Sequence, residues 1–593
     1  MQIDSLERLL RGNEQEGWSE FCDPLWLDLL QQLLAANDSP SQLLLTTQDI
    51  PGDLDAVASR TPQFWHCEPL QGLNPDEQRT LFQNLGLNPS AADWEHLQHI
   101  GAFYNGHPLV LQVITEELRQ PPFRGNIAHY WQHYEAEFTA TAPATANRLD
   151  RSRLFRRRVR QRVEQAIQRL PEAARQLLCA CAVFRRPVPE AFWYAMLPNG
   201  DPQTAFDTLQ DHHLIEYTSD PLPFTLYPSP FLIKQHNLTR SIAYSLLKVD
   251  TPTWEAAERQ AAHLWLTAYQ PAPDAPNLET VRGYLEAFEH YCEVGDWEAA
   301  KTILLDQQIG LRLQTWGKFQ EMLICHRRLI SHLQAQDEVA CQKGLGNAYY
   351  CLSNYSQAKL HYQQSLDLAR EINDKQGQWK ALNNLGNVLQ ALGQYAESID
   401  FLQQTLALAQ EIGDRRGEGN ALGNLGLAYD SMGQYERAID FHQQYLTIAR
   451  EIGDRSGEAI ALGNLGSAYC ALGDYSRALE LQEEKLAIAV EIGSRQTESY
   501  ALSGRGEALL KLEQYSEALT SLQNALAISQ ETGERSLEAE VLKTLAELHQ
   551  ALGEGEAARW YAQQALALAT ELGTPLQSEC ESLLAELEQD NED

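Results

Sequence analysis

Amide side chains in the C-terminal half carry the clearest chemistry of this sequence, and that chemistry is hydrogen bonding. Asn383, Asn387 and Gln390 follow one another at intervals of four and three residues, which places them on one face of a helix. Because an amide both donates and accepts hydrogen bonds, a ladder of such side chains can hold an extended peptide backbone. No histidine has a serine, aspartate or cysteine partner at a recognisable catalytic spacing, so we name no catalytic residue.

The amides belong to a sequence that repeats itself every forty residues. The period is kept by the dipeptides Leu385-Gly386, Leu425-Gly426, Leu465-Gly466 and Arg505-Gly506, and by Tyr395, Tyr435, Tyr475 and Tyr515. A period of this length is typical of stacked repeats, in which each unit buries its apolar face against its neighbours. An extended binding surface is therefore the first functional hypothesis.

The unit at residues 418–457 shows how each repeat is expected to pack. Its two helices present apolar or small faces made of Leu422, Leu425, Ala428 and Tyr429, and of Ala438, Ile439, His442, Leu446 and Ala449. A glycine inside a helix costs ~1 kcal/mol relative to alanine, so the recurrence of Gly426 indicates close approach of a neighbouring helix. Gly433 suits a left-handed helix end, and Gly453-Asp454-Arg455 turns the chain into the next unit.

These residues resemble the tetratricopeptide repeat in the Leu-Gly pair, in the aromatic Tyr429 and in the small Ala438. The match covers about residues 338–575, and degenerate units such as Gly295–Ala300 place the start of the array near residue 252. Tandem helix pairs of this kind form a superhelix whose concave wall is lined by the first helix of each pair.

The resemblance implies that the concave groove binds a protein or peptide partner, as similar adaptors do with asparagines at such positions. The residues that we expect to line this groove are Asn383, Asn384, Asn387, Gln390, Asn424, Leu427, Asp430, Asn464 and Ser467. The alternative is that the amides are solvated or bond within the array.

Four arginines pose a similar question, because they recur with the turn between units. They either bind an acidic peptide, or cap the preceding helix dipole and pair with local glutamates. These residues are Arg415, Arg455, Arg495 and Arg535.

The first third of the chain lacks the repeat. Residues 41–47 form a short apolar run typical of a buried strand, a helix is expected before it at 25–36, and residues 1–4 predict the tail of another strand. Pro108 suits the first turn of an apolar helix. In this order the segments resemble the back half of an NB-ARC-type signalling ATPase, followed by a winged-helix domain.

That resemblance covers about residues 1–250 and implies a nucleotide-site remnant. Asp4 and Glu7 would belong to the acidic strand that holds magnesium, residues 43–49 to the sensor strand, and Pro108 would abut the adenine. The predicted domains are a partial NB-ARC-like region without a phosphate loop (1–150), a winged-helix-like domain (151–250), degenerate helical repeats (252–337) and the tetratricopeptide array (338–593). The fold class is mainly α: an α-α superhelix preceded by a partial α/β NTPase remnant and a winged helix.

Departures from the ATPase pattern decide against catalysis. No Gly-x-x-x-x-Gly-Lys-Ser/Thr loop occurs, while Gln48 and Ser229 stand where the family has a sensor arginine and a histidine that reads ADP. Positioning the phosphates is nearly the whole of phosphoryl-transfer catalysis, so we expect no enzyme, no cofactor and no metal, and no nucleotide bound by this chain alone. The alternative is a nucleotide-switched ATPase whose loop comes from a longer or separate chain, since a start on the acidic strand suggests a truncated or split gene.

Composition narrows the partners. Lys and Arg number 46 against 81 Asp and Glu, and this net charge of −35 repels nucleic acid and anionic lipid. Seven arginines at 151–162 are therefore expected to dock on acidic surface. Ten scattered cysteines form no metal-binding pattern and predict free thiols. Without a signal peptide or a run of about 18 apolar residues, the prediction is a cytoplasmic interaction scaffold or signalling adaptor with no membrane partner.

Overall fold

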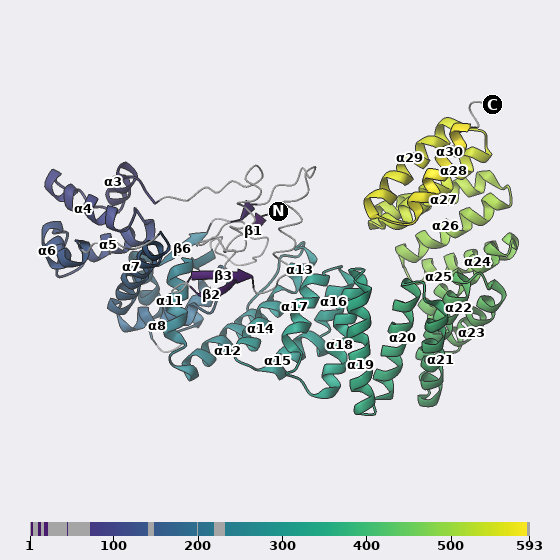
Figure 1. The fold of residues 1–593 in the computed structure, drawn as a ribbon, viewed down its shortest axis with the longest axis horizontal. Coiled ribbons are helices and arrows are strands. Elements are labelled where there is room, and N and C mark those ends of the chain that lie inside the picture. The colour runs from purple at the N-terminus through teal and green to yellow at the C-terminus, as the bar shows by residue number, and fades with distance from the viewer. Residues whose placement is uncertain are drawn as a thin grey trace. The chain divides into compact units, whose positions relative to one another are not determined.

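The computed structural model describes residues 2–3, 10–13, 17–21, 44–45, 72–139, 148–197, 200–218 and 232–589. Contacts divide the chain into two units, Met1–Asp296 and Trp297–Asp593. Both are mainly helical (Figure 1). The second unit contains the predicted repeats of residues 338–593, whereas residues 252–296, expected to be degenerate repeats, lie in the first unit.

The first unit begins with short strands. β1 (Gln2–Ile3) pairs in parallel with β4 (Leu44–Leu45), and β2 (Leu10–Asn13) pairs antiparallel with β3 (Gly17–Phe21). Strands thus occur at both of the expected places. Asp4, Glu7, Gln48, Ser229 and the helix expected at 25–36 lie outside the described residues.

A group of helices follows the strands. They are α3 (Pro75–Asn84), α4 (Ala91–Phe103), α5 (Pro108–Arg119), α6 (Ile127–Phe138) and α7 (Arg148–Arg169). Pro108 is the first residue of α5, as predicted. The arginine-rich α7 docks on acidic side chains, because the buried Arg162 pairs with Glu117 of α5 and with Glu137 of α6. The expectation for this arginine run is confirmed at Arg162.

The rest of the first unit combines helices with one small sheet. Its elements are α8 (Glu172–Cys181), β5 (Val188–Pro189), α9 (Glu190–Ala195), α10 (Pro202–Asp211), β6 (Ile215–Thr218), β7 (Leu232–Gln235), α11 (Asn237–Leu247), α12 (Thr251–Thr267), α13 (Asn277–Thr280) and α14 (Arg282–Glu293). The sheet has the antiparallel order β5-β7-β6. A buried contact of 2.6 Å between Glu258 and His290 joins α12 to α14.

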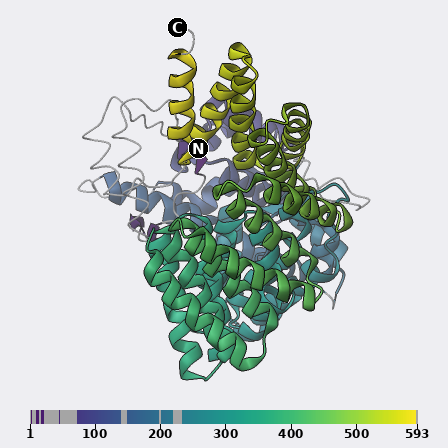
Figure 2. The same ribbon diagram turned by 90° about the vertical axis from the view of Figure 1, so that its right-hand side faces the viewer.

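The second unit opens with short helices and continues as six helix pairs and a last helix. The opening elements are α15 (Trp297–Lys301), the π-helix η2 (Thr302–Asp306), α16 (Ile309–Thr315) and α17 (Phe319–Leu329). The pairs are α18 (Ala335–Cys351) with α19 (Tyr355–Glu371), α20 (Lys375–Ala391) with α21 (Tyr395–Ile412), α22 (Arg415–Ser431) with α23 (Tyr435–Glu451), α24 (Arg455–Ala471) with α25 (Tyr475–Glu491), α26 (Arg495–Lys511) with α27 (Tyr515–Thr532), and α28 (Arg535–Ala551) with α29 (Gly555–Leu572), before α30 (Leu576–Gln589). Successive helices lie side by side in chain order in both views (Figures 1 and 2).

One turn ends each pair and begins the next. Gly453 adopts φ +68, which closes α23, and the Asp454 carboxylate accepts a hydrogen bond from the Gly457 backbone at 3.0 Å to cap α24. Gly413 and Asp414 do the same between α21 and α22. Two residues of the Gly-Asp-Arg turn therefore end one helix and cap the backbone N–H groups at the start of the next.

Glycines, which have no side chain, allow the two helices of a pair to approach closely. A Cβ on Gly426 would overlap the ring of His442, and one on Gly386 would lie 2.8 Å from the Leu402 side chain. Both bulky partners lie sixteen residues after their glycine, on the second helix of the same pair. The prediction that these glycines permit close packing is confirmed.

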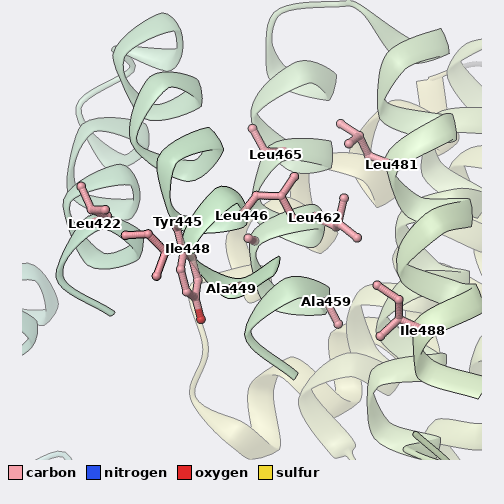
Figure 3. Packing of buried hydrophobic residues seen from close by; sticks show 11 residues of the cluster. Leu422, Tyr445, Leu446, Ile448, Ala449, Ala459, Leu462, Leu465, Leu481 and Ile488 are labelled. Atoms are coloured by element: carbon pink, nitrogen blue, oxygen red, sulfur yellow. The ribbon is translucent and has the colours of Figure 1, made fainter. Parts of the chain in front are cut away.

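Buried apolar clusters fill the space between successive helix pairs. Figure 3 shows Leu446 and Ala449 of α23 facing Leu462 and Leu465 of α24, with Ile488 of α25 completing the cluster. All five side chains are at most 3 % exposed. Burying such side chains contributes about 1.5–3 kcal/mol for each large one, so each pair depends on its neighbours for stability.

Candidate functional site

In the second unit, a cavity of about 360 Å³ opens on the face formed by the first helix of each helix pair. Because the first helices of consecutive pairs contact one another directly, from α18 through to α28, they form one wall of the array. The cavity is lined mainly from α18 and α20, and α16, α19 and α22 contribute one residue each. Its lining residues are Gln314, Lys343, Asn347, Tyr350, Cys351, Tyr362, Trp379, Lys380, Asn383, Asn384, Asn387 and Asn420.

Some of the predicted amides bond to one another across the wall. Asn424 Nδ2 donates to Asn383 Oδ1 at 2.9 Å, and Gln390 Nε2 donates to the Asn424 carbonyl oxygen at 2.9 Å. Asn384 Nδ2 donates to Asn347 Oδ1 at 3.3 Å. The alternative that amides bond within the array is thus correct for these pairs, and the bonds brace α18, α20 and α22 against each other.

Other donors of the cavity stay available. Asn383 accepts from Asn424 through its oxygen, which leaves its NH₂ group without a partner among the described residues. Asn387 and Asn420 have no hydrogen-bond partner in that part of the chain. The indole N–H of the lining Trp379 also lacks an acceptor there, but this atom is buried and is not accessible to a ligand. The amide donors favour a ligand that brings acceptors.

Two lysines give the cavity its charge. Lys343 and Lys380 are half-buried, and neither has an ion-pair partner within the described ranges. Burial, and then the charge of Lys380, lowers the pKa of Lys343. In a chain of net charge −35, two unpaired ammonium groups in one cavity mark a local preference for an anion.

Beyond the cavity the same face becomes apolar. The position of Lys380 and Asn420 recurs as Ile460 in α24 and Tyr500 in α26, and the position of Asn387 recurs as Leu427 in α22. Leu427 is 39 %, Ile460 54 % and Tyr500 39 % exposed. Three exposed apolar side chains at groove positions of consecutive repeats form an apolar stretch that suits a protein partner.

The far end of the same face is acidic. The two groove positions continue as Glu507 in α26 and as Glu540 and Glu547 in α28. Desolvation by the surrounding wall, and then the charge of a neighbouring glutamate, raises the pKa of Glu507 and of Glu540. Lys543 offsets part of this charge, with ion pairs of 3.3 Å to Glu547 and 2.7 Å to Glu579.

The residues that the sequence predicts for the groove differ in their surroundings. Ser467 is exposed and Asn464 is half-buried on the first helix α24. Asp430 is half-buried on α22, and one of its oxygens lies 3.0 Å from Nε2 of the buried His442. Asn383, Asn384 and Asn387 are the predicted residues that line the cavity. Sequence reasoning missed Lys343 and Lys380, although the spacing of Lys343 to Asn347 places both on one helix face.

The turn arginines pair with glutamates. Arg495 of α26 binds Glu498 within its own helix at 2.7 Å and Glu531 on α27, the second helix of the same pair, at 2.8 Å. Arg535 of α28 binds Glu571 of α29 at 2.8 Å. Arg415 and Arg455 make the equivalent contacts. Of the two roles considered, local pairing is confirmed, and these exposed ion pairs join the two helices of each pair.

No cofactor site is apparent in the part of the chain that the structure describes. That part holds no group of three or more His, Cys, Asp or Glu side chains placed to bind a metal. Its eight cysteines are free thiols, as predicted. Among the described helices, none has the length and apolar composition needed to cross a bilayer.

Sequence models of the tetratricopeptide repeat match residues 380–451, 461–496 and 497–571. The C-terminal region is therefore an α-superhelical array of tetratricopeptide repeats. A search of curated proteins finds no match.

A search of solved structures finds several to which this chain is similar at low identity, three of which are as follows. A signal-transduction ATPase with a tetratricopeptide repeat sensor from Pyrococcus horikoshii is 16% identical, with 99% of this chain and 83% of that chain covered and a TM-score of 0.40. Aspartyl phosphate phosphatase F from Bacillus subtilis is 12% identical over 78% and 93%, with a TM-score of 0.38. The quorum sensor NprR from B. thuringiensis is 16% identical over 53% and 99%, with a TM-score of 0.33.

Proposed function

We propose that this protein is a non-enzymatic interaction scaffold, or signalling adaptor, whose array binds an extended segment of a protein partner. The groove consists of the wall of first helices from α18 to α28. One observation carries the proposal: the cavity at α18–α22 presents donors without partners and continues into exposed apolar positions along that wall. Amides that bond across the wall hold these groups in place before a partner arrives, which reduces the entropy lost on binding.

The first unit would then be a regulatory base without enzymatic activity. The element order α8-β5-α9-α10-β6-β7, with its three-stranded sheet, supports a winged-helix-like domain. We keep the boundaries 1–150, 151–250, 252–337 and 338–593 as proposed regions.

Comparative capture tests the groove. The full chain, an Asn387→Ala/Asn420→Ala variant and a Gln403→Ala/Gln404→Ala variant on the second helix α21 are each incubated with lysate of the source cells. Residues 403 and 404 are exposed, so this pair is a matched surface control. We expect a protein retained by the wild type and the control to be lost by the groove variant. Equal retention by all three would reject the groove.

A nucleotide-switched ATPase is the second candidate. The parallel pairing of β1 with β4 supports it, because the acidic strand and the sensor strand of such modules occur in this order. Calorimetric titration of the full chain with Mg-ATP distinguishes the two. We expect no saturable heat, and micromolar binding would favour the ATPase.

A further inference from the structure

The groove wall carries opposite charge at its two ends. Lys343 and Lys380 lie at the α18–α20 end, whereas Glu507, Glu540 and Glu547 follow at groove positions of α26 and α28. Between them lie the exposed apolar side chains of Leu427, Ile460 and Tyr500, together with the small polar Ser467. A symmetric or uncharged partner would gain nothing from this order.

Lys343 and Lys380 differ from the cations that join helices of the array through ion pairs, whereas Lys485 on α25 is a further half-buried lysine without an ion pair in the described residues. Lys375 pairs with Glu411 at 2.5 Å and Lys543 with Glu579 at 2.7 Å, in the manner of the turn arginines. Within the described part, Lys343 and Lys380 have no such carboxylate. A half-buried ammonium without a counter-charge is costly, and an incoming carboxylate relieves that cost.

We propose, on the basis of the proposed function, that the groove selects an acidic-apolar peptide segment in one direction. An acidic side chain of the partner docks between Lys343 and Lys380, where Asn383 and Asn387 donate further hydrogen bonds. Apolar side chains of the same segment then lie over Leu427, Ile460 and Tyr500. The glutamates beyond them repel an anion, so the segment does not bind in the reverse direction.

The spacing of the partner's residues follows from the repeat. Helices in contact lie about 10 Å apart, and an extended peptide advances about 3.3 Å per residue. One step from a first helix to the next therefore corresponds to about three peptide residues. The apolar side chains over Leu427, Ile460 and Tyr500 should thus lie about three, six and nine residues from the acid.

Fluorescence anisotropy with the full chain tests the proposal. The probes are fluorescein-labelled peptides with a pair of glutamates, about three serines and then two leucines spaced by about three residues, made in both chain directions. Matched peptides carry glutamine in place of glutamate. We expect the better glutamate peptide to bind at least about tenfold more tightly than its glutamine form, since a charge-assisted hydrogen bond contributes about 1.5–3 kcal/mol.

Variants locate the effect. Lys343→Gln and Lys380→Gln should each remove most of the preference for glutamate, whereas Lys359→Gln, an exposed lysine on the second helix α19, should retain it. Ile460→Ser should weaken the glutamate and glutamine peptides by the same factor. Circular dichroism checks that each variant keeps its helices.

The outcomes separate this inference from the proposed function. Equal affinity for glutamate and glutamine peptides, or a preference that survives both lysine substitutions, would overturn the acidic-apolar inference while groove-dependent capture still stands. Absence of binding by every peptide would overturn it as well. Loss of groove-dependent capture together with tight glutamate binding would instead contradict the scaffold.

Discussion

Asn424 on α22 donates a hydrogen bond from its side chain to the side-chain oxygen of Asn383 on α20, at 2.9 Å. The two residues are 41 positions apart, so the bond joins one repeat to the next across the wall of first helices. The bond uses the Asn383 oxygen as an acceptor, so the NH₂ group of this cavity-lining residue remains available to donate to a ligand.

This bond should couple the stability of two repeats. In a double-mutant cycle of Asn383→Ala and Asn424→Ala, measured by urea unfolding of the full chain, we expect a coupling energy of about 1 kcal/mol. Asn464→Ala with Asn383→Ala is the control, because that pair shares no hydrogen bond in the described structure and should be additive. Zero coupling for the first pair would show that the amide bond does not brace the wall.

Substitution of glycine by alanine should lower the stability of the protein much more at the closely packed Gly426 than at the open Gly555. Gly426→Ala forces a methyl group into the His442 ring, and overpacking of this kind costs about 1–3 kcal/mol. Gly555→Ala is the matched control, because only the Arg559 side chain lies near, at 3.9 Å, and alanine should be neutral or stabilising by about 0.5 kcal/mol. Thermal unfolding followed by circular dichroism checks both, and equal melting temperatures would contradict the packing argument.

Lys485 should lower the stability of the array at neutral pH. Burial lowers its pKa from 10.5 to about 8, and its ammonium lies over the Tyr500 ring at 5.8 Å without an ion pair in the described residues. The unfolded lysine binds its proton more tightly, so the folded state is destabilised below pH 8 and the cost fades between pH 8 and 10.5.

Lys485→Met is therefore expected to raise the unfolding free energy by about 1 kcal/mol at pH 7, after allowance for partial exposure. The gain should shrink toward pH 10. Urea unfolding across this pH range, with Lys359→Met as an exposed control, measures it. A gain that does not change with pH would show that lost charge is not the cause.

Binding of an acidic peptide should depend on pH through Lys343. In the free protein, burial and Lys380 lower the pKa of Lys343, and a bound carboxylate would raise it. Binding then takes up a proton at alkaline pH, so the affinity should fall as pH rises through the lowered pKa. Anisotropy titrations from neutral to alkaline pH should show this fall, and Lys343→Gln should flatten it. An identical pH profile in that variant would exclude Lys343 as the linked group.

The forty-residue period made the array predictable because its signals are local and repeated. Gly426, Gly433 and Asp454 each act within one helix pair or one turn, so the sequence contains the whole cause of their conformation. The chemistry of the groove depends instead on which residues of different repeats meet.

The repeat pattern did not indicate that Lys343 and Lys380 line the same cavity. They occupy different positions of the repeat, and only the stacking of α18 on α20 brings both to one cavity. Asp430 has a contact that the repeat pattern did not indicate: one of its oxygens lies 3.0 Å from Nε2 of His442, twelve residues later. Its place in the groove remains a prediction. For the first third, the remnant residues Asp4 and Glu7 remain predictions.

Site-specific photocrosslinking tests the central claim most directly. p-Benzoylphenylalanine replaces the exposed Leu427 in the groove or the exposed Gln403 on the second helix α21, in the full chain expressed in its source cells. We predict an ultraviolet-dependent adduct with a partner protein at position 427 and none at position 403. Adducts at 403 with none at 427 would contradict binding along the wall of first helices.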